Sequence, residues 1–330
     1  MGNEKKKVLL IGYFGFGNPG DEAILSVVED ELDKHEIKFR TYGVGTSPIL
    51  RSIGIRRAVY ESAAVIFTGG NLLQNETSNL SLLYYLRIIS IAKRAGVPVL
   101  FAASGIGRLR GALTHLTSRL ISNVHFFGAR TEHDKAFADS LGVKDSIIMP
   151  DVCFTLSEHV KLKTQRFAYI PTREDTDLEE KIIRIANELS LTPTVIPFQY
   201  EHDFPICKKI ATRIHAPLSV PGNQNELFSI LAECRFSVSD RLHGAIFSML
   251  SHTLSFISEK SEKCRALTEH VQKLSESLST ESPLIPIREF NSDKIKELGA
   301  KSSEFNKLLK HLKETSYDGL CALRHALTGN

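Results

Sequence analysis

Short apolar runs alternate with amphipathic segments along the chain, a pattern typical of helices laid over a mostly parallel β-sheet. In the first half, the predicted strands are residues 7–13, 37–44, 65–68, 98–103, 124–129 and 146–149. The helices predicted between them are residues 21–35, 80–95, 113–122 and 132–141. We therefore expect an N-terminal Rossmann-like domain over residues 1–160.

A polar passage, residues 157–165, precedes a second alternating series. Its predicted strands are residues 167–171, 194–198, 218–220, 236–238 and 253–257. Its predicted helices are residues 177–189, 204–214, 224–234 and 242–250. The pattern predicts a smaller Rossmann-like domain over residues 166–260, followed by a mainly helical segment, residues 261–330, that packs on the domains. The predicted fold class is thus α/β, with two doubly wound domains facing a cleft.

Composition agrees with a soluble two-domain protein. The 330 residues are 42% hydrophobic, enough for a sizeable core, which excludes a disordered or fibrous chain. The longest apolar runs, residues 8–11 and 97–103, fall far short of the roughly 20 residues of a membrane helix, and residues 1–7 are too polar for a signal peptide. We therefore expect a cytoplasmic protein.

Charge and cysteine content exclude several classes of partner. The 41 basic and 38 acidic residues give a net charge of only +3, too balanced for a general nucleic-acid binder. The five cysteines are scattered and form no Cys-x-x-Cys pair, which argues against a zinc ribbon or a disulfide framework. We expect reduced, buried thiols.

A glycine-rich turn, residues 12–22, joins the first predicted strand to the first helix. The glycines with the Gly-x-Gly-x-x-Gly spacing of dinucleotide sites are Gly15, Gly17 and Gly20. However, the second strand ends without the acidic residue that would hold a ribose, and Asp21 and Glu22 place two negative charges where a pyrophosphate would lie. A tight turn capped by Asn18 and a ligand-binding loop both stay open.

Two further loops follow predicted strands. Gly69, Gly70, Asn71 and Gln74 belong to a polar loop whose amide groups suit sugar hydroxyls or phosphate oxygens. A purely structural loop, capped by Thr77 or Ser78 before the next helix, is the alternative. Residues 103–108 form a third glycine turn with a cation beside it.

Charged residues also follow buried strands. Arg130 stands between a strand and a helix, where a guanidinium can bind a carboxylate or phosphate in a bidentate fork. The alternative is an ion pair with Glu132 or Asp134. Asp151 places a carboxylate at the end of the next strand.

Residues 237–247 are the most specific stretch of the chain. A strand runs into a polar turn and a helix of small residues, so Arg241 and His243 lie near a helix N-terminus, where the helix dipole, guanidinium and imidazole all favour an anion. The sequence has no His-Glu-x-x-His metal motif, no Gly-x-Ser-x-Gly elbow and no P-loop. We therefore expect no metal and neither of those hydrolase mechanisms.

Together, these motifs resemble the polysaccharide pyruvyl transferase family, in order, over most of the first 260 residues. The resemblance implies a GT-B-like fold and transfer of the enolpyruvyl unit of phosphoenolpyruvate onto two hydroxyls of a sugar, leaving a pyruvate ketal and phosphate. It implies that phosphoenolpyruvate is bound by Arg130, Arg241, Leu242 and His243. The further substrate-binding candidates are Gly17, Asn18, Asp21, Glu22, Gly69, Gly70, Asn71, Gln74, Asp151 and Asp240.

On this interpretation the donor is phosphoenolpyruvate, no other cofactor is needed, and the acceptor is a free, polymeric or lipid-linked saccharide of the cell surface. His243 is the candidate general acid or phosphate clamp. A nucleotide-sugar glycosyltransferase, a non-catalytic binding protein and, last, an NAD-dependent dehydrogenase are the alternatives. The lysine-rich segment 307–313 predicts a solvated helix face in preference to a membrane contact.

Overall fold

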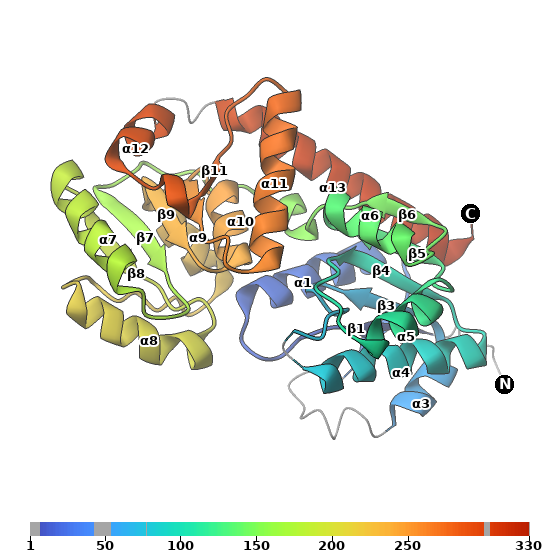
Figure 1. The fold of residues 1–330 in the computed structure, drawn as a ribbon. Coiled ribbons are helices and arrows are strands. Elements are labelled where there is room, and N and C mark those ends of the chain that lie inside the picture. Colours follow the sequence, from blue (N-terminus) through green and yellow to red (C-terminus); the bar gives the residue numbers. More distant parts are fainter. Residues whose placement is uncertain (1–6, 43–53, 77, 300–303, 330) are drawn as a thin grey trace. The chain divides into compact units, whose positions relative to one another are not determined.

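The computed structural model describes residues 7–42, 54–76, 78–299 and 304–329, and its contacts divide the chain into two units (Figure 1). Unit 1 comprises residues 1–16, 21–155 and 312–330, and unit 2 comprises residues 17–20 and 156–311. The short segment 17–20 thus packs with unit 2, although the chain on either side of it belongs to unit 1.

Unit 1 is built on a six-stranded parallel sheet with strand order β2-β1-β3-β4-β5-β6. Its strands are β1 (Lys7–Ile11), β2 (Phe39–Thr41), β3 (Ser62–Thr68), β4 (Val99–Ser104), β5 (Phe126–Ala129) and β6 (Ser146–Ile148). Its helices are α1 (Pro19–Lys34), α3 (Ile55–Tyr60), α4 (Asn79–Ala95), α5 (Ala112–Ile121), α6 (Glu132–Ser140) and the short 3-10 helix η1 (Val152–Thr155).

The core of unit 1 lies against the central strands. Phe67, Phe101 and Phe127 occupy adjacent strands, with ring centroids 4.8 Å and 5.0 Å apart, and all three are fully buried. Near-continuous apolar strands of this kind are expected where helices cover both faces of a parallel sheet. The order and direction of the strands bring their carboxyl ends, and the loops that follow them, to one edge of the sheet.

Unit 2 has a five-stranded parallel sheet with strand order β11-β10-β9-β7-β8. Its strands are β7 (Arg166–Ile170), β8 (Thr192–Val195), β9 (Phe236–Ser239), β10 (Leu254–Ile257) and β11 (Leu284–Pro286). Its helices are α7 (Thr176–Leu189), α8 (Tyr200–Arg213), α9 (Gln224–Glu233), α10 (Leu242–Leu250), α11 (Glu262–Ser277), η2 (Ile287–Glu289) and α12 (Ser292–Gly299).

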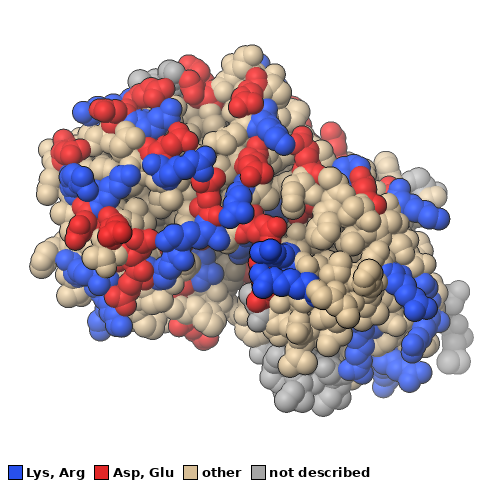
Figure 2. All heavy atoms as spheres, viewed as in Figure 1, with Lys and Arg blue, Asp and Glu red and all other residues tan. Residues whose placement is uncertain are grey.

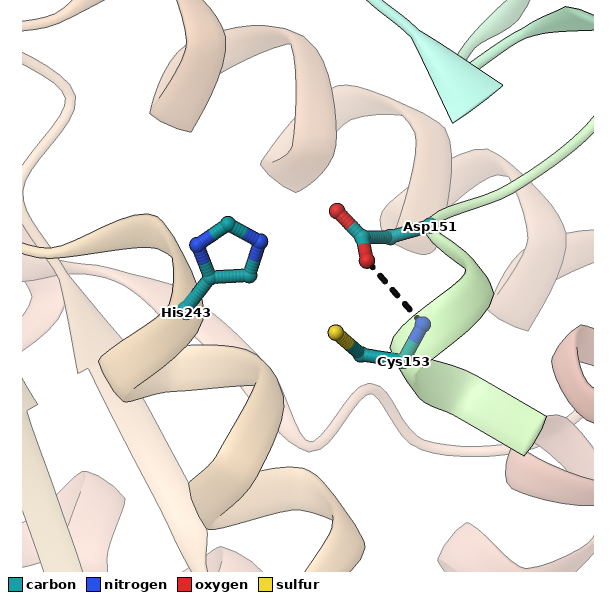
Figure 3. Close-up of side chains that lie close together, drawn as sticks. All are labelled: Asp151, Cys153 and His243. Carbon is teal, nitrogen blue, oxygen red and sulfur yellow. Dashed lines mark hydrogen bonds between the residues drawn. The ribbon is translucent and has the colours of Figure 1, made fainter. Parts of the chain in front are cut away.

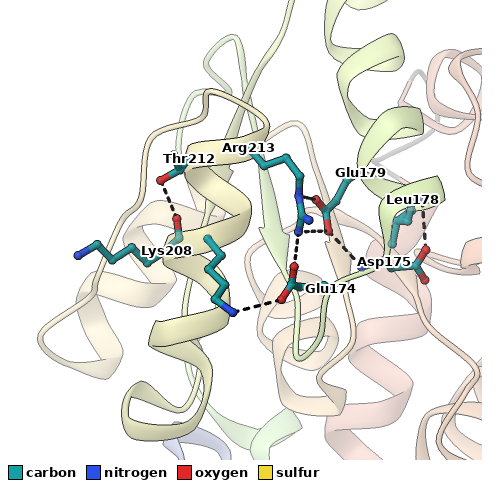
Figure 4. Close-up of polar contacts among 8 residues, drawn as sticks. Glu174, Asp175, Leu178, Glu179, Lys208, Thr212 and Arg213 are labelled. Carbon is teal, nitrogen blue, oxygen red and sulfur yellow. Dashed lines mark hydrogen bonds and ion pairs between the residues drawn. The ribbon is translucent and has the colours of Figure 1, made fainter.

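The loop between β7 and α7 is fixed by a polar network in unit 2 (Figure 4). Arg213 donates from Nε to Oε2 of the buried Glu179 over 2.6 Å and from Nη2 to Glu174 over 2.9 Å. Asp175 caps α7 by accepting from the Leu178 N–H, and its own N–H donates to Glu179. Because Glu179 is both paired and hydrogen-bonded, its burial does not leave an uncompensated charge.

Several elements differ from the sequence prediction. The predicted strand 218–220 is only an isolated bridge between Leu218 and Val195, because prolines stand on both sides of it. The helix α3 was not predicted. Ser78 caps α4 by accepting from the Ser81 N–H, whereas Thr77 lies outside the described residues.

The C-terminal region differs most from the predicted helical segment 261–330. It contributes a strand, β11, to the sheet of unit 2. The end of the region forms one long helix, α13 (Phe305–Thr328), whose residues from 312 onward belong to unit 1. Arg324 pairs there with Glu31 of α1 over 3.0 Å.

Candidate functional site

The turn between β9 and α10 holds the most specific sequence motif, residues 239–244 of unit 2. The Ser239 hydroxyl accepts from the Arg241 N–H over 3.0 Å and donates to the Arg241 carbonyl over 2.8 Å, so one side chain fixes the turn. Arg241 is the N-cap residue of α10, and its side chain makes no capping hydrogen bond. The first N–H groups of the helix therefore point out of its N-terminus, where they favour an anion.

Arg241 is held by an acidic residue that the motif does not contain. Its Nε donates to Oδ2 of Asp203 over 3.1 Å, and its Nη2 donates to Oδ1 of the same carboxylate. Asp203, on α8, is almost fully buried and also accepts from the Gln199 N–H over 2.8 Å. The bidentate pair fixes the plane of the guanidinium and leaves Nη1 to face another group.

His243 lies in the first turn of α10 and is 7% exposed. Gly20, in the segment of the glycine-rich turn that belongs to unit 2, packs directly against its ring. A Cβ built on Gly20 would lie 2.0 Å from Nδ1 of His243, a distance that no side chain tolerates. The third glycine of the Gly-x-Gly-x-x-Gly spacing is thus explained by contact with His243 rather than by a pyrophosphate.

The neighbours of His243 in the motif have structural partners. Asp240 accepts from the Thr172 N–H over 3.0 Å and so joins the ends of β9 and β7. Leu242 is buried at 1% exposure. Both were predicted to bind substrate, and the structure shows that each supports the turn that carries Arg241 and His243.

In unit 1, the loops after β3 and β4 pack against each other. The N–H of Gly105 donates to the Gly70 carbonyl over 3.3 Å. A Cβ on Gly105 would lie 2.2 Å from Oδ1 of Asn71, and one on Gly107 would lie 2.6 Å from Cβ of Gln74. Gly69 and Gly70 both have positive φ, which favours glycine. These glycines let two polar loops meet at the carboxyl edge of the sheet.

The glycine-rich turn before α1 is folded by two of its predicted site residues. Glu22 accepts from the Gly15 N–H over 2.6 Å, and Asn18 accepts from the Gly20 N–H over 3.2 Å as α1 begins at Pro19. Asp21 is nearly buried in the first turn of α1. Tyr13 and Phe16 stack with ring centroids 4.4 Å apart.

Arg130 and Asp151 form a buried ion pair in unit 1. Arg130 Nε lies 3.3 Å from Asp151 Oδ2, and the two side chains are 3% and 0% exposed. The predicted partners, Glu132 and Asp134, do not fill this role: Asp134 instead accepts from the Thr131 hydroxyl and from the Ile106 N–H. The pair joins the ends of β5 and β6.

Asp151 also organises the start of η1 (Figure 3). Its Oδ1 accepts from the Cys153 N–H over 3.1 Å, and its backbone carbonyl accepts from the Ser316 hydroxyl of α13 over 3.4 Å. Burial, with the nearby Asp151 carboxylate, raises the pKa of the Cys153 thiol well above its usual range. Cys153 is therefore a neutral thiol and not a nucleophile at neutral pH.

Two buried polar atoms at the carboxyl edge of the unit 1 sheet make no hydrogen bond within the described residues. They are Nη2 of Arg130 and Oγ1 of Thr68, the last residue of β3. A buried donor without a partner costs free energy, so such atoms are rare unless a ligand or water completes them. Their position agrees with a polar ligand at this edge.

The sequence profile of the polysaccharide pyruvyl transferase family matches residues 18–256. The chain belongs to this family. Every candidate site residue except Gly17 lies within the match. No curated protein shows significant sequence similarity to this polysaccharide pyruvyl transferase family member.

Solved structures support the GT-B-like fold expected of this family member. UDP-GlcNAc 2-epimerase from Neisseria meningitidis has a TM-score of 0.57 at 10% identity, with 98% of this chain and 100% of that chain covered. MnaA from S. aureus gives 0.57 at 12% identity, with 97% and 95% covered. MurG from Acinetobacter baumannii gives 0.52 at 9% identity, with 97% and 99% covered. At such low identity the likeness concerns the fold alone.

Within residues 7–42, 54–76, 78–299 and 304–329, no helix combines the length and the apolar character needed to cross a bilayer.

Proposed function

We propose that the protein transfers the enolpyruvyl unit of phosphoenolpyruvate onto two hydroxyls of a saccharide and releases phosphate. The observation that carries the proposal is the β9–α10 turn, where a guanidinium fixed by Asp203, an imidazole and a helix N-terminus are held together. Phosphoenolpyruvate carries a phosphate and a carboxylate, and each of these groups of the protein favours an anion.

In this proposal Arg241 binds an anionic group of the donor through the part of its guanidinium that Asp203 leaves free. His243, when protonated, either holds the phosphate or acts as the general acid. Family membership supports pyruvyl transfer in general, and the identity of the donor rests on these two residues.

Unit 1 is proposed to bind the saccharide. The loops that carry Gly69, Asn71 and Gln74 offer amide groups at the carboxyl edge of its sheet, where open parallel sheets bind ligands. The stacked rings of Tyr13 and Phe16 offer an aromatic surface of the kind that packs on a sugar ring. Arg130 keeps its proposed role in binding phosphoenolpyruvate, and its Nη2, which lacks a hydrogen-bond partner among the described residues, is the buried donor that it offers at the same edge.

The chemistry balances without a redox partner. A general acid protonates the methylene carbon of phosphoenolpyruvate while the first saccharide hydroxyl attacks the adjacent carbon and loses its proton. The second hydroxyl then forms a bond to the same carbon, the bond from that carbon to the phosphate oxygen breaks, and the proton of the second hydroxyl goes to the departing phosphate. The products are a cyclic pyruvate ketal and inorganic phosphate. Fixed cations near the leaving phosphate stabilise the charge that develops there.

Phosphate release from phosphoenolpyruvate in the presence of candidate acceptor saccharides tests the proposal. His243→Ala and Arg241→Ala should each lower turnover about 10² to 10³-fold with the fold retained. The matched controls are His202→Ala and Arg184→Ala, which remove the same side chains from exposed positions on α8 and α7. Near wild-type turnover in both site variants would overturn the assignment.

Thermal stability with separate ligands distinguishes the other functions. Phosphoenolpyruvate at 100 times its dissociation constant should stabilise the protein by about 2.7 kcal/mol. That gain should vanish in Arg241→Ala. Stabilisation by a UDP-sugar alone would instead indicate a glycosyltransferase, and stabilisation by NADH alone would indicate a dehydrogenase. The cytoplasmic location and the cell-surface saccharide stay predictions.

A further inference from the structure

The charges of the chain are unevenly distributed. Residues 77–131 contain seven Lys and Arg and not a single Asp or Glu. The other 275 residues hold 34 basic and 38 acidic side chains, so this stretch alone accounts for the positive net charge. It spans α4, β4, α5 and β5 of unit 1. Because the stretch contains no acidic residue, one part of unit 1 carries a local positive charge that the near-neutral net charge of the whole chain does not reveal.

Six of the seven cations lie on the surface: Arg87, Lys93, Arg94, Arg108, Arg110 and Arg119. Within the described residues none of the six forms an ion pair, whereas buried Arg130 pairs with Asp151. Figure 2, viewed as Figure 1, shows Lys and Arg groups with little acidic surface over the lower part of unit 1, where α4 lies. The positive charge of this region is therefore open to an external anion.

The loop that carries Arg108 and Arg110 is fixed against the start of α4. Asn75 accepts from the Arg110 N–H over 2.9 Å and donates to the Arg110 carbonyl over 3.1 Å. The Asn75 N–H donates to the Arg108 carbonyl over 3.3 Å. Leu109, between the two arginines, packs on the core of unit 1. With Leu109 anchored inward, the loop presents both guanidinium groups outward.

Large apolar side chains stand beside these cations. Leu80 on α4 is 79% exposed, and Leu83 on α4 and Leu116 on α5 are 39% and 38% exposed. Leu80, Leu83 and Arg87 follow the i, i+3, i+7 spacing of one helix face, and Leu116 and Arg119 follow the i, i+3 spacing on α5. The two helices contact each other. Exposed leucines interleaved with unpaired cations are the pattern of interfacial membrane helices.

We propose that this α4–α5 surface, formed by Leu80, Leu83, Arg108, Arg110, Leu116 and Arg119, docks on an anionic membrane surface. The cations match the negative headgroups, and the leucines supply the apolar contact that a nucleic acid would not require. The proposal goes beyond pyruvyl transfer and does not depend on it.

The lysine-rich segment 307–313 of α13 is a weaker membrane candidate than the α4–α5 surface. Its leucines, Leu308, Leu309 and Leu312, are buried in the protein, so it has no apolar contact to offer. Lys307 donates to the Leu278 carbonyl over 2.6 Å. This segment is therefore part of a helix that packs on the protein through its leucines.

Cosedimentation with lipid vesicles tests the proposal independently of activity. The full-length protein should bind vesicles of phosphatidylcholine mixed with phosphatidylglycerol, bind phosphatidylcholine alone far more weakly, and lose affinity as salt rises. Arg108→Gln/Arg110→Gln should weaken binding about thirtyfold. Leu80→Ser/Leu83→Ser should weaken it about tenfold or more. Each variant is first checked for an unchanged thermal midpoint.

The controls remove equivalent groups from unit 2. Arg184→Gln/Lys208→Gln takes two exposed cations from α7 and α8, and Leu162→Ser takes away a leucine that is 92% exposed. Both should bind like wild type. The proposal is overturned by equal binding to the two kinds of vesicle, by losses as large in the controls, or by binding of single-stranded RNA without binding of vesicles.

Discussion

Arg241, at the start of α10, and Asp203, on α8, form a bidentate ion pair that joins the β9–α10 turn of unit 2 to a separate helix. Nothing in the sequence motif 239–244 indicates Asp203, because it lies 38 residues earlier and outside any recognisable pattern. The pair means that Arg241 is held in place before any ligand arrives. An arginine so fixed loses less side-chain entropy when it binds a substrate.

Asp203→Asn tests whether this pair positions Arg241. The amide cannot accept two charge-assisted hydrogen bonds, and its NH₂ group repels the guanidinium, so Arg241 should leave its present orientation. We expect the KM for phosphoenolpyruvate to rise about tenfold, with a smaller change in kcat, because a charged hydrogen-bonded contact contributes about 1.5 to 3 kcal/mol. Steady-state kinetics measures both constants.

Glu201→Gln is the control for that substitution, since it makes the same chemical change at an exposed position on the same helix. Its constants should equal those of wild type. If Asp203→Asn changes neither KM nor kcat, Asp203 serves only the folding of α8.

Gly20→Ala is predicted to disable the site by way of His243. The added Cβ would lie 2.0 Å from Nδ1 of His243, so either the ring or the start of α1 must shift. A displacement of about 1 Å in a catalytic group can cost about 10²-fold in rate, which is the loss we expect in turnover. Gly299→Ala is the matched control, because a Cβ there meets no atom within 4 Å. Equal turnover in the two variants contradicts the role proposed for His243.

The motifs could be read from the sequence because they follow strands, and a parallel sheet brings the ends of its strands to one edge. The residues with which these motifs pair could not be predicted from the sequence. The pair between Arg130 and Asp151 depends on β5 lying next to β6. The alternative partner Asp134, within α6, does not pair with Arg130, because its carboxylate already accepts from the Thr131 hydroxyl and from the Ile106 N–H. The spacing of residues along the chain indicates which of them lie near a strand end. It does not indicate with which oppositely charged side chain each one forms an ion pair.

The C-terminal region shows why local pattern also failed for some elements. The sequence predicted only a mainly helical segment over residues 261–330, and the local pattern did not show that α13 continues through the polar residues 314–319. Tertiary contacts explain the continuity: the Ser316 hydroxyl binds the Asp151 carbonyl, and a Cβ on Gly319 would lie 2.4 Å from Met149. β11 was not predicted from the sequence; it lies at the edge of its sheet, where a strand tolerates a proline such as Pro286.

The thiols should differ sharply in reactivity. Four cysteines are buried, and burial raises the pKa of Cys207 and of Cys234 to about 12 and that of Cys153 well above its usual range. Cys321 is partly exposed on α13. At pH 8 the native protein should therefore react rapidly with one equivalent of a thiol reagent, and the unfolded protein with five. Cys321→Ser should abolish the rapid phase. Any fast-reacting thiol left in that variant would contradict the buried environment of the other four.

Asp175 should stabilise unit 2 both as a cap and as a charge. It accepts from the Leu178 N–H and from Lys260 Nζ, and the Lys260 hydrogen bond lowers the pKa of its carboxyl below the usual value. Asp175→Ala should cost about 1 kcal/mol at pH 7, whereas Asp175→Asn, which keeps the cap, should cost less. A lowered pKa means that the unfolded chain binds the proton more readily, so the charge stabilises above the unfolded pKa and its effect is lost as pH falls. Denaturant titrations from pH 7 down to about pH 2 should show the gap between wild type and Asp175→Asn closing below about pH 5, and a constant gap over that range would assign the whole effect to the cap.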